Sequence, residues 1–338
     1  GDSVGMNQEL QSIYMGTGDD DEASFHYHYK TFDNVALLDG IKQVPKVVIE
    51  YLTNCGDKRD FEFGSICVME SMAYILERCC YPNASRSPDI PYSSAEMLVE
   101  LIYPDFGKNP LNILALCDAS MQSFNPGTFL YDTLLEIEKA KKQFAKPEDV
   151  YTFCYSIHPP FNYNNTKHTL DTLFPEIAKT AKKQIQDYFN HGYFNPVKDW
   201  LGNLFDQAMN YRLKNPYFPL DIARGGVAPT NLALSNFIKA VGTPLVSNNN
   251  GDVVLGDPKA GTSSGSQYAL IWAIDQINSV FWGIQKNCDM IPLCNKNKNI
   301  KVDTRCVSSP WERSNDDEKC PFAQIWFHWG LKNYSPVS

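Results

Sequence analysis

The sequence predicts a mixed α/β fold of two similar layers, with the join near residues 170–185. Three observations support this prediction. A chain of 338 residues with 43% apolar residues can bury the core of one large domain or of two moderate ones. Short strand-like and helix-like segments alternate on both sides of the join. Two amphipathic helical segments in the middle of the chain mark the join itself.

The elements of the first part follow from composition and spacing. Residues 1–25 are polar and predict an arm or a loop. Apolar residues recur at helical spacing over two stretches, residues 65–76 and 95–102. Aromatic and β-branched residues, or short apolar runs, predict strands at residues 24–30, 46–52, 111–116, 151–161 and 301–311.

The middle of the chain predicts two consecutive helices. Ile177, Ala181 and Ile185 share one face of the first helix, and Gly192 is placed to end it. Asn195-Pro196 opens the second helix as cap and first residue. After this pair we expect a strand at residues 252–255, a turn at 261–265, and a helix or strand over 268–282.

Charge and hydropathy limit the functional classes. The net charge of -9 argues against tight, sequence-independent DNA binding, because that binding draws its affinity from phosphate neutralisation by Lys and Arg. No run of eighteen or more apolar residues is present, so the sequence predicts no membrane-spanning segment.

Ten cysteines and two sequons favour a secreted, extracellular glycoprotein. Four of the cysteines fall in an irregular C-terminal region that would gain from cross-linking, so we expect disulfides among Cys288, Cys294, Cys306 and Cys320. The alternative is zinc binding, but the paired two-residue spacing of zinc ribbons is missing. The sequons predict glycosylation at Asn83 and Asn164.

Six histidines are the candidates for catalysis. His28-Tyr29-Lys30 is a His-x-Lys pair, in which an imidazole nucleophile stands beside a phosphate-neutralising ammonium, but a second copy is missing. Two strand histidines, His26 and His28, are more simply half-exposed side chains of one face. His158 precedes two prolines and suits either a catalytic or a capping role. No hydrolase elbow, phosphate-binding loop or dinucleotide fingerprint is present.

Segments in both halves, taken in chain order, resemble the deoxyribonuclease II family of lysosomal and secreted nucleases. They are Ser24–Lys30, Asn112–Asp118, Tyr155–Phe161, Ser247–Lys259, Trp282–Cys294 and Cys306–Trp311. The last, Cys306-Val-Ser-Ser-Pro-Trp311, is the most specific. The resemblance implies a phospholipase D-like fold with two pseudo-repeated halves, residues 1–176 and 177–338, each with a mixed β-sheet flanked by helices.

The resemblance also implies that the catalytic groups are lost. It puts Thr128 and Leu130 where the family has the His and Lys of its first motif, and Tyr155 where it has the His of the next strand. The second motif falls on Thr304 and Arg305, with a cation but no imidazole. Such a nuclease needs one histidine to form a phosphoenzyme and another to protonate the leaving oxygen. Losing groups that act as a unit costs about a million-fold in rate.

The sequence therefore predicts a catalytically degenerate member of that family, of the kind that parasitic nematodes secrete. We expect it to need no cofactor or metal, and to bind an unknown protein, peptide or extracellular-matrix ligand in a cleft between the halves, with DNA binding doubtful. The rival is an active acid endonuclease that uses a shifted site at His158, His26 or His28. A third interpretation is a structural or antigenic secretory protein without a specific ligand.

Overall fold

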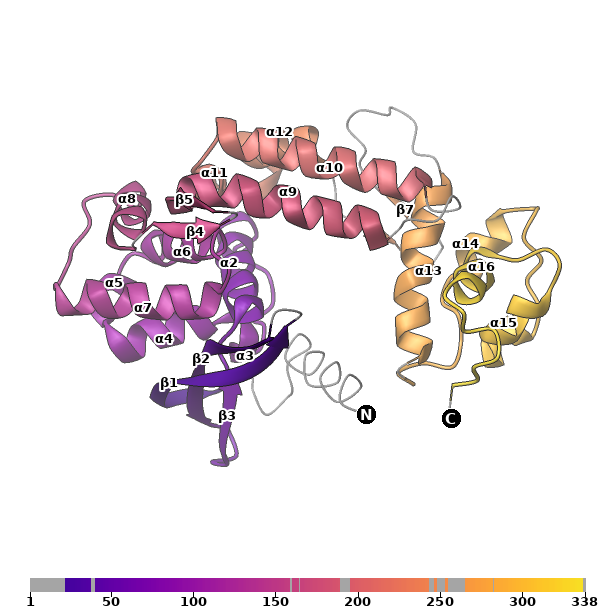
Figure 1. Ribbon diagram of the computed structural model, residues 1–338, viewed down its shortest axis with the longest axis horizontal. Coiled ribbons are helices and arrows are strands. Elements are labelled where there is room, and N and C mark those ends of the chain that lie inside the picture. The colour runs from indigo at the N-terminus through magenta and orange to yellow at the C-terminus, as the bar shows by residue number, and fades with distance from the viewer. Residues whose placement is uncertain are drawn as a thin grey trace. The chain divides into compact units, whose positions relative to one another are not determined.

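The computed structural model describes residues 22–37, 40–158, 160–163, 165–188, 195–242, 246–247, 253–254, 265–281 and 283–336. The chain divides into two compact units. Unit 1 contains residues 1–181 and 212–235, and unit 2 contains residues 182–211 and 236–338. The division falls within three helices, α9 (Leu170–Tyr188), α10 (Asn195–Lys214) and α12 (Leu232–Val241), and the predicted boundary after residue 176 lies inside α9. Helices and small antiparallel sheets together make up both units, which confirms the coarse prediction of helices mixed with strands (Figure 1).

Unit 1 begins with an antiparallel sheet of order β1-β2-β3. The strands are β1 (Ser24–Leu37), β2 (Gly40–Leu52) and β3 (Lys58–Glu62). The strands predicted at residues 24–30 and 46–52 are confirmed, and both extend further into one long hairpin. Val47 and Ile49 of the middle strand are fully buried, so this face of the sheet packs on the core.

Helices form most of the rest of unit 1. Four of them, α2, α4, α6 and α7, contact one another, and α7 also packs on β2 (Figure 1). A two-stranded antiparallel sheet joins β4 (Phe161–Tyr163) to β5 (Thr166–His168). The helices assigned to this unit are α2 (Ser65–Cys80), α3 (Asp89–Tyr92), α4 (Ser94–Ile102), α5 (Pro104–Gly107), α6 (Pro110–Ser120), α7 (Pro126–Lys139), α8 (Glu148–Ile157), α11 (Phe218–Arg224) and the 3-10 helix η3 (Ala228–Thr230); α12 (Leu232–Val241) crosses the division.

Helix α6 lies at the centre of this core and corrects the strand predicted at residues 111–116. Every residue from Asn112 to Ser120 is buried, because the helix is surrounded on all sides. An apolar run without helical periodicity fits a fully buried helix as well as a buried strand. The local start signals decide for the helix: Pro110 is its first residue, and the Asn109 side chain accepts a hydrogen bond from the Leu111 N–H at 3.1 Å.

The strands predicted at residues 151–161 and 301–311 are also wrong. Residues 148–157 form α8, whose buried side chains Tyr151 and Cys154 are three positions apart, while Glu148 and Asp149 lie in its favourable first turn. Of the described residues in this segment, Phe161 alone lies in a strand, as the first residue of β4. Residues 301–311 include the short helix α15 (Arg305–Ser308) and the beginning of the 3-10 helix η4 (Pro310–Asn315). In residues 151–157, burial against a helical core overrides the β propensity of the aromatic and β-branched residues.

The core of unit 2 is helical. Helix α13 (Gly265–Phe281) contacts α16 (Pro321–His328), and α14 (Ile291–Lys296) adds to the same cluster, with Trp326 and Phe322 among its most buried side chains. The strands described in this unit are β6 (Val246–Ser247) and β7 (Val253–Val254), which pair antiparallel. Mixed sheets were predicted for both halves, whereas all strand pairs in the described ranges are antiparallel. The phospholipase D-like arrangement stays a prediction.

The predicted helix pair in the middle of the chain is confirmed as α9 and α10. Lys182 Nζ lies 2.7 Å from Asp206 Oδ1, and Val197 is fully buried in the unit 2 core. Gly192, the predicted stop of the first helix, lies outside the described residues. None of the helices that the structure describes has the length and hydropathy needed to span a bilayer.

Candidate functional site

The single His-x-Lys pair of the sequence lies on β1 and points toward the helices. His28 stands opposite Ile49 in the sheet, and opposed residues of an antiparallel pair project from the same face. Lys30, two residues on, shares that face. His28 Nδ1 lies 2.9 Å from the hydroxyl of Tyr131, and Lys30 Nζ lies 2.7 Å from Asp132 Oδ2. The two candidate side chains of β1 therefore contact consecutive residues of α7, Tyr131 and Asp132.

His158 reaches the same helix from the end of α8. Its Nε2 atom lies 2.9 Å from the Thr133 hydroxyl, and its ring stacks on Phe129 with 4.0 Å between centroids. Burial lowers the pKa of His158, although the Asp132 carboxylate opposes the shift. Burial also lowers the pKa of His28. Both imidazoles are therefore neutral at physiological pH.

The two histidines contact α7 from opposite sides. Tyr131 and Thr133 are two positions apart, so their side chains point about 200° apart around the helix axis. Asp132, between them in sequence, forms an ion pair with Lys30. The third candidate, His26, has its Nε2 atom 3.8 Å from Glu50, next to a bulge in β1. This arrangement supplies separate hydrogen-bonded imidazoles rather than a facing pair.

The other face of β1 carries exposed aromatic side chains, and its outer edge pairs with none of the described strands. Tyr27 and Tyr29 share the face opposite His28, with 5.9 Å between ring centroids, and Tyr27 is 54% exposed. Phe32, further along the strand on the same face as His28, is 57% exposed. Helix α4 contacts β1, but among the strands that the structure describes β1 pairs with β2 alone. An antiparallel strand uses only alternate backbone groups for one neighbour, so β1 is an edge strand with a second row of donors and acceptors.

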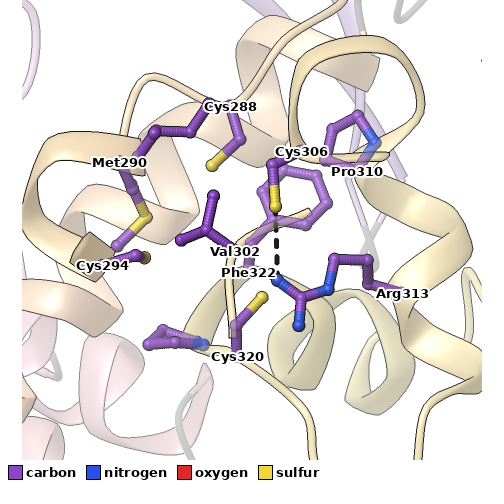
Figure 2. A pocket seen from close by; sticks show the side chains of 11 residues that line it. Cys288, Met290, Cys294, Val302, Cys306, Pro310, Arg313, Cys320 and Phe322 are labelled. Atoms are coloured by element: carbon purple, nitrogen blue, oxygen red, sulfur yellow. Dashed lines mark hydrogen bonds between the residues drawn. The ribbon is translucent and has the colours of Figure 1, made fainter. Parts of the chain in front are cut away.

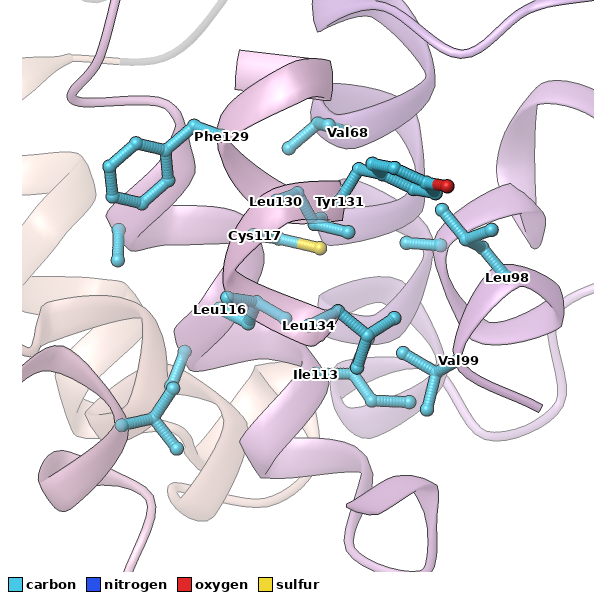
Figure 3. Close-up of a cluster of buried hydrophobic side chains, with 14 of the residues drawn as sticks. Val68, Leu98, Val99, Ile113, Leu116, Cys117, Phe129, Leu130, Tyr131 and Leu134 are labelled. Atoms are coloured by element: carbon cyan, nitrogen blue, oxygen red, sulfur yellow. The ribbon is translucent and has the colours of Figure 1, made fainter. Parts of the chain in front are cut away.

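The positions that the family resemblance assigns to lost catalytic groups in unit 1 have structural partners. The Thr128 hydroxyl donates to the carbonyl of Pro45 at 3.1 Å. Leu130 is fully buried, and Figure 3 shows it among the side chains of the unit 1 core. The Tyr155 hydroxyl donates to Gln122 at 3.1 Å, and burial raises the pKa of Tyr155 to about 12. Thr128 and Leu130 lie on α7 and Tyr155 on α8, which are helices rather than strand ends.

The corresponding positions in unit 2 lie around an ion-paired arginine. Thr304 is exposed, and Arg305 bonds to Asp303 at 2.7 Å and to Asp316 at 2.8 Å. The Arg305 guanidinium lowers the pKa of both carboxylates. Arg313 also lies close to Asp316, at 3.4 Å. The cation predicted to survive at this motif is therefore neutralised by two carboxylates.

A buried ion pair in unit 1 was missed by sequence reasoning. Asp118 of α6 accepts two hydrogen bonds from Arg212, at the end of α10, and one from the Tyr151 hydroxyl at 2.7 Å. The Asp118 side chain is 1% exposed and that of Arg212 is 16% exposed. The available signal was a carboxylate directly after an apolar run, since such a group must be paired when it is buried. Its partner lies 94 residues further along the chain.

The remaining predicted sites have different outcomes. Asn83 lies in an exposed turn closed by a hydrogen bond from the Ala84 N–H to the Tyr81 carbonyl, so the sequon is accessible. Asn164 lies outside the described residues. Within the described ranges, no group of three or more His, Cys, Asp and Glu residues is arranged to hold a metal ion. The four C-terminal cysteines come together in unit 2.

Comparisons with known proteins give no assignment. No protein-family model matches the chain. No curated protein and no solved structure matches it either. The likeness to the deoxyribonuclease II family therefore stays a prediction that rests on the quoted segments alone.

Proposed function

We propose that the protein is a non-catalytic binding protein and that the outer edge of β1 binds an extended peptide. One observation carries the proposal: β1 is 14 residues long, and among the described strands it pairs only with β2. Long exposed edge strands pair readily with other chains unless they are protected by charge, proline or a covering element. An extended peptide would add a fourth strand and gain main-chain hydrogen bonds.

The aromatic face of β1 supports a peptide as the ligand. Tyr27 and Tyr29 form a neighbouring pair beside the open edge, and Tyr27 keeps more than half of its surface exposed. Tyrosine supplies a large, rigid contact area together with a hydroxyl, and it is enriched among residues that dominate binding energy. Backbone pairing would give affinity, and contacts of alternate peptide side chains with these rings would give specificity.

The charge arrangement favours such a ligand over a nucleic acid. Lys30 is paired with Asp132, and Arg305 is paired with Asp303 and Asp316. Lys30 and Arg305 are the cations of the two candidate motifs, and each would have to leave a carboxylate to bind a phosphate. The net charge of -9 adds long-range repulsion. An acid endonuclease would in addition need two imidazoles at one phosphate, whereas His28 and His158 contact opposite sides of α7.

The wider setting of this function is also a proposal. Secretion and glycosylation at Asn83 fit the exposed sequon and the cysteine-rich C-terminal region. Descent from a deoxyribonuclease II-like enzyme would explain the order of the quoted segments. Neither proposal is needed for the edge-strand mechanism, which depends only on β1 and its neighbours.

Peptide selection with matched variants tests the binding site. A random-peptide library would be selected on the full chain, and the affinity of enriched synthetic peptides measured by fluorescence polarisation. We expect Tyr27→Lys to weaken binding at least about tenfold, because it removes an aromatic contact and adds a charge to the edge. Tyr81→Lys is the control, since Tyr81 is also 54% exposed but lies after α2. Equal losses in both variants, or none in Tyr27→Lys, would exclude β1 as the site.

A further inference from the structure

Four cysteines that are far apart in the C-terminal sequence surround one small cavity in unit 2. Its volume is about 10 Å³, and Cys288, Cys294, Cys306 and Cys320 all line it. Figure 2 shows these side chains around the same space, from the loop after α13, from α14, from α15 and from the residue that caps α16. Met290, Val302 and Phe322 contribute apolar walls. The four thiols therefore line one small cavity in the core of unit 2.

The backbone brings one pair into bridging position. The Cys288 N–H donates to the Cys306 carbonyl at 2.8 Å. Backbone bond lengths add at most about 3.9 Å to this N···O distance, so the two Cα atoms lie within about 6.7 Å of each other, inside the range of about 4.4–6.8 Å found for disulfide-linked residues. Pairing Cys288 with Cys306 leaves Cys294 and Cys320 on the remaining walls of the cavity.

Burial makes two of the four reduced thiols, those of Cys288 and Cys294, poor nucleophiles. Loss of solvation, together with the neighbouring thiols, raises the pKa of Cys288 and of Cys294 to about 12. The thiolate is the species that attacks a disulfide, so a fully folded, reduced unit 2 would oxidise very slowly. Arg313 donates from Nη1 to the Cys306 sulfur at 3.2 Å, but the guanidinium is already shared with Asp316. Oxidation would therefore have to precede closure of this core.

We propose that these four cysteines form two structural disulfides, Cys288–Cys306 and Cys294–Cys320, made before the core of unit 2 closes. Each bridge forms when two S–H bonds break and one S–S bond forms. Two protons are released and two electrons pass to an oxidant of the thiol–disulfide class, either a protein oxidoreductase or glutathione disulfide. The two chain segments that these disulfides would close, residues 288–306 and 294–320, overlap in sequence. Together the bridges would connect α14, α15 and the start of α16 to the loop after α13.

The proposal does not extend to a second group of three cysteines in unit 1. Cys67, Cys117 and Cys154 are fully buried in the separate unit 1 core. Burial strongly raises the pKa of each thiol, and Figure 3 shows Cys117 enclosed by aliphatic side chains. We expect these three to stay reduced after the four cysteines of unit 2 have been oxidised. They serve as internal controls in the same sample.

Refolding followed by peptide mapping tests the connectivity. The denatured, reduced full chain would be refolded in a glutathione redox buffer, then unfolded in alkylating reagent and digested without reduction. We expect peptides linked through Cys288–Cys306 and Cys294–Cys320, with about 2 Da lost per bridge, and alkylated Cys67, Cys117 and Cys154. Free thiols at all four positions, a bound metal ion in native mass spectra, or the pairs Cys288–Cys294 and Cys306–Cys320 would each overturn the proposal.

The order of events has its own test. Chain refolded first in reducing buffer and then moved to the redox buffer should form these bridges at least about tenfold more slowly than chain refolded directly in it, because thiolates with raised pKa values are scarce at neutral pH. The double variant Cys288→Ser/Cys306→Ser should keep the Cys294–Cys320 peptide, and Cys55→Ser, at an exposed position, should change neither bridge. Equal oxidation rates from both starting states would contradict closure after oxidation.

Discussion

Asp118 is a buried charge in the core of unit 1. Its carboxylate is removed from water and balanced by Arg212 and by the Tyr151 hydroxyl. Breaking a buried pair by removing one partner typically costs about 3–5 kcal/mol, because the other charge stays buried without compensation. A solvent-exposed pair contributes only about 0–1 kcal/mol.

We therefore expect Asp118→Asn to lower the free energy of unfolding by about 3–5 kcal/mol in urea titrations. Asp132→Asn is the matched control, since it removes the Asp132 carboxylate from its exposed pair with Lys30 and should change the free energy by less than about 1 kcal/mol. Equal effects of the two substitutions would show that the Asp118 pair has no special weight.

A second charge pair links stability to pH. Arg224 donates to Glu148 and lowers the pKa of that carboxyl to about 2. Because the folded-state pKa is below the unfolded value of about 4.3, the pair stabilises the fold above that value, and this contribution is lost as the pH falls toward 2. We expect the difference in unfolding free energy between wild type and Glu148→Gln to shrink over this window. A difference that stays constant from pH 5 to pH 2 would disprove the linkage.

At the scale of elements, the first turn of α7 is fixed by a close backbone contact. A Cβ atom at Gly127 would lie 2.1 Å from the carbonyl oxygen of Phe63, which belongs to the backbone between β3 and α2. Neither segment can move without disturbing the core. Gly202 of α10 is different, because a Cβ there would meet the mobile amide end of the Gln186 side chain.

We expect Gly127→Ala to destabilise the protein by about 2–3 kcal/mol, as overpacked sites do. Gly202→Ala should be close to neutral, because alanine favours the helix and Gln186 can turn away. Thermal unfolding of both variants measures the difference. If Gly127→Ala unfolds like wild type, the contact between α7 and Phe63 is looser than described.

The sequence predicted elements well where propensity and burial agree. Residues 24–30 and 46–52 alternate or are β-branched, and they form β1 and β2. The sequence predicts strands at residues 111–116 and 151–161, but residues 111–116 and 151–157 lie in helices. The helical periodicity of such a segment is hidden when all of its sides are buried or when aromatic residues face a helical core. The start signals Asn109 and Pro110 indicate the first of these helices, whereas the second has no capping hydrogen bond from its N-cap and depends on tertiary packing.

At the scale of the whole molecule, the candidate groups could be found from sequence but their partners could not. His28, Lys30 and His158 stood out because imidazoles and a His-x-Lys pair are few. The residues that they contact on α7 are remote in sequence: Tyr131 lies 103 positions after His28. No sequence motif predicts the ion pairs that neutralise Lys30 and Arg305. These pairings are the reason that we expect no phosphate binding at the two motifs.

DNA binding by the full chain, measured as a function of salt, tests this conclusion most directly. Fluorescence polarisation with a labelled duplex would be recorded at physiological and at lower salt, and plasmid integrity at acid and neutral pH checked in parallel. We expect no saturation up to about 100 µM protein at physiological salt and intact plasmid, because the candidate cations are paired and the two histidines do not face each other. Submicromolar affinity that falls steeply with salt, or plasmid nicking that disappears in His158→Ala, would contradict a non-catalytic, peptide-binding role.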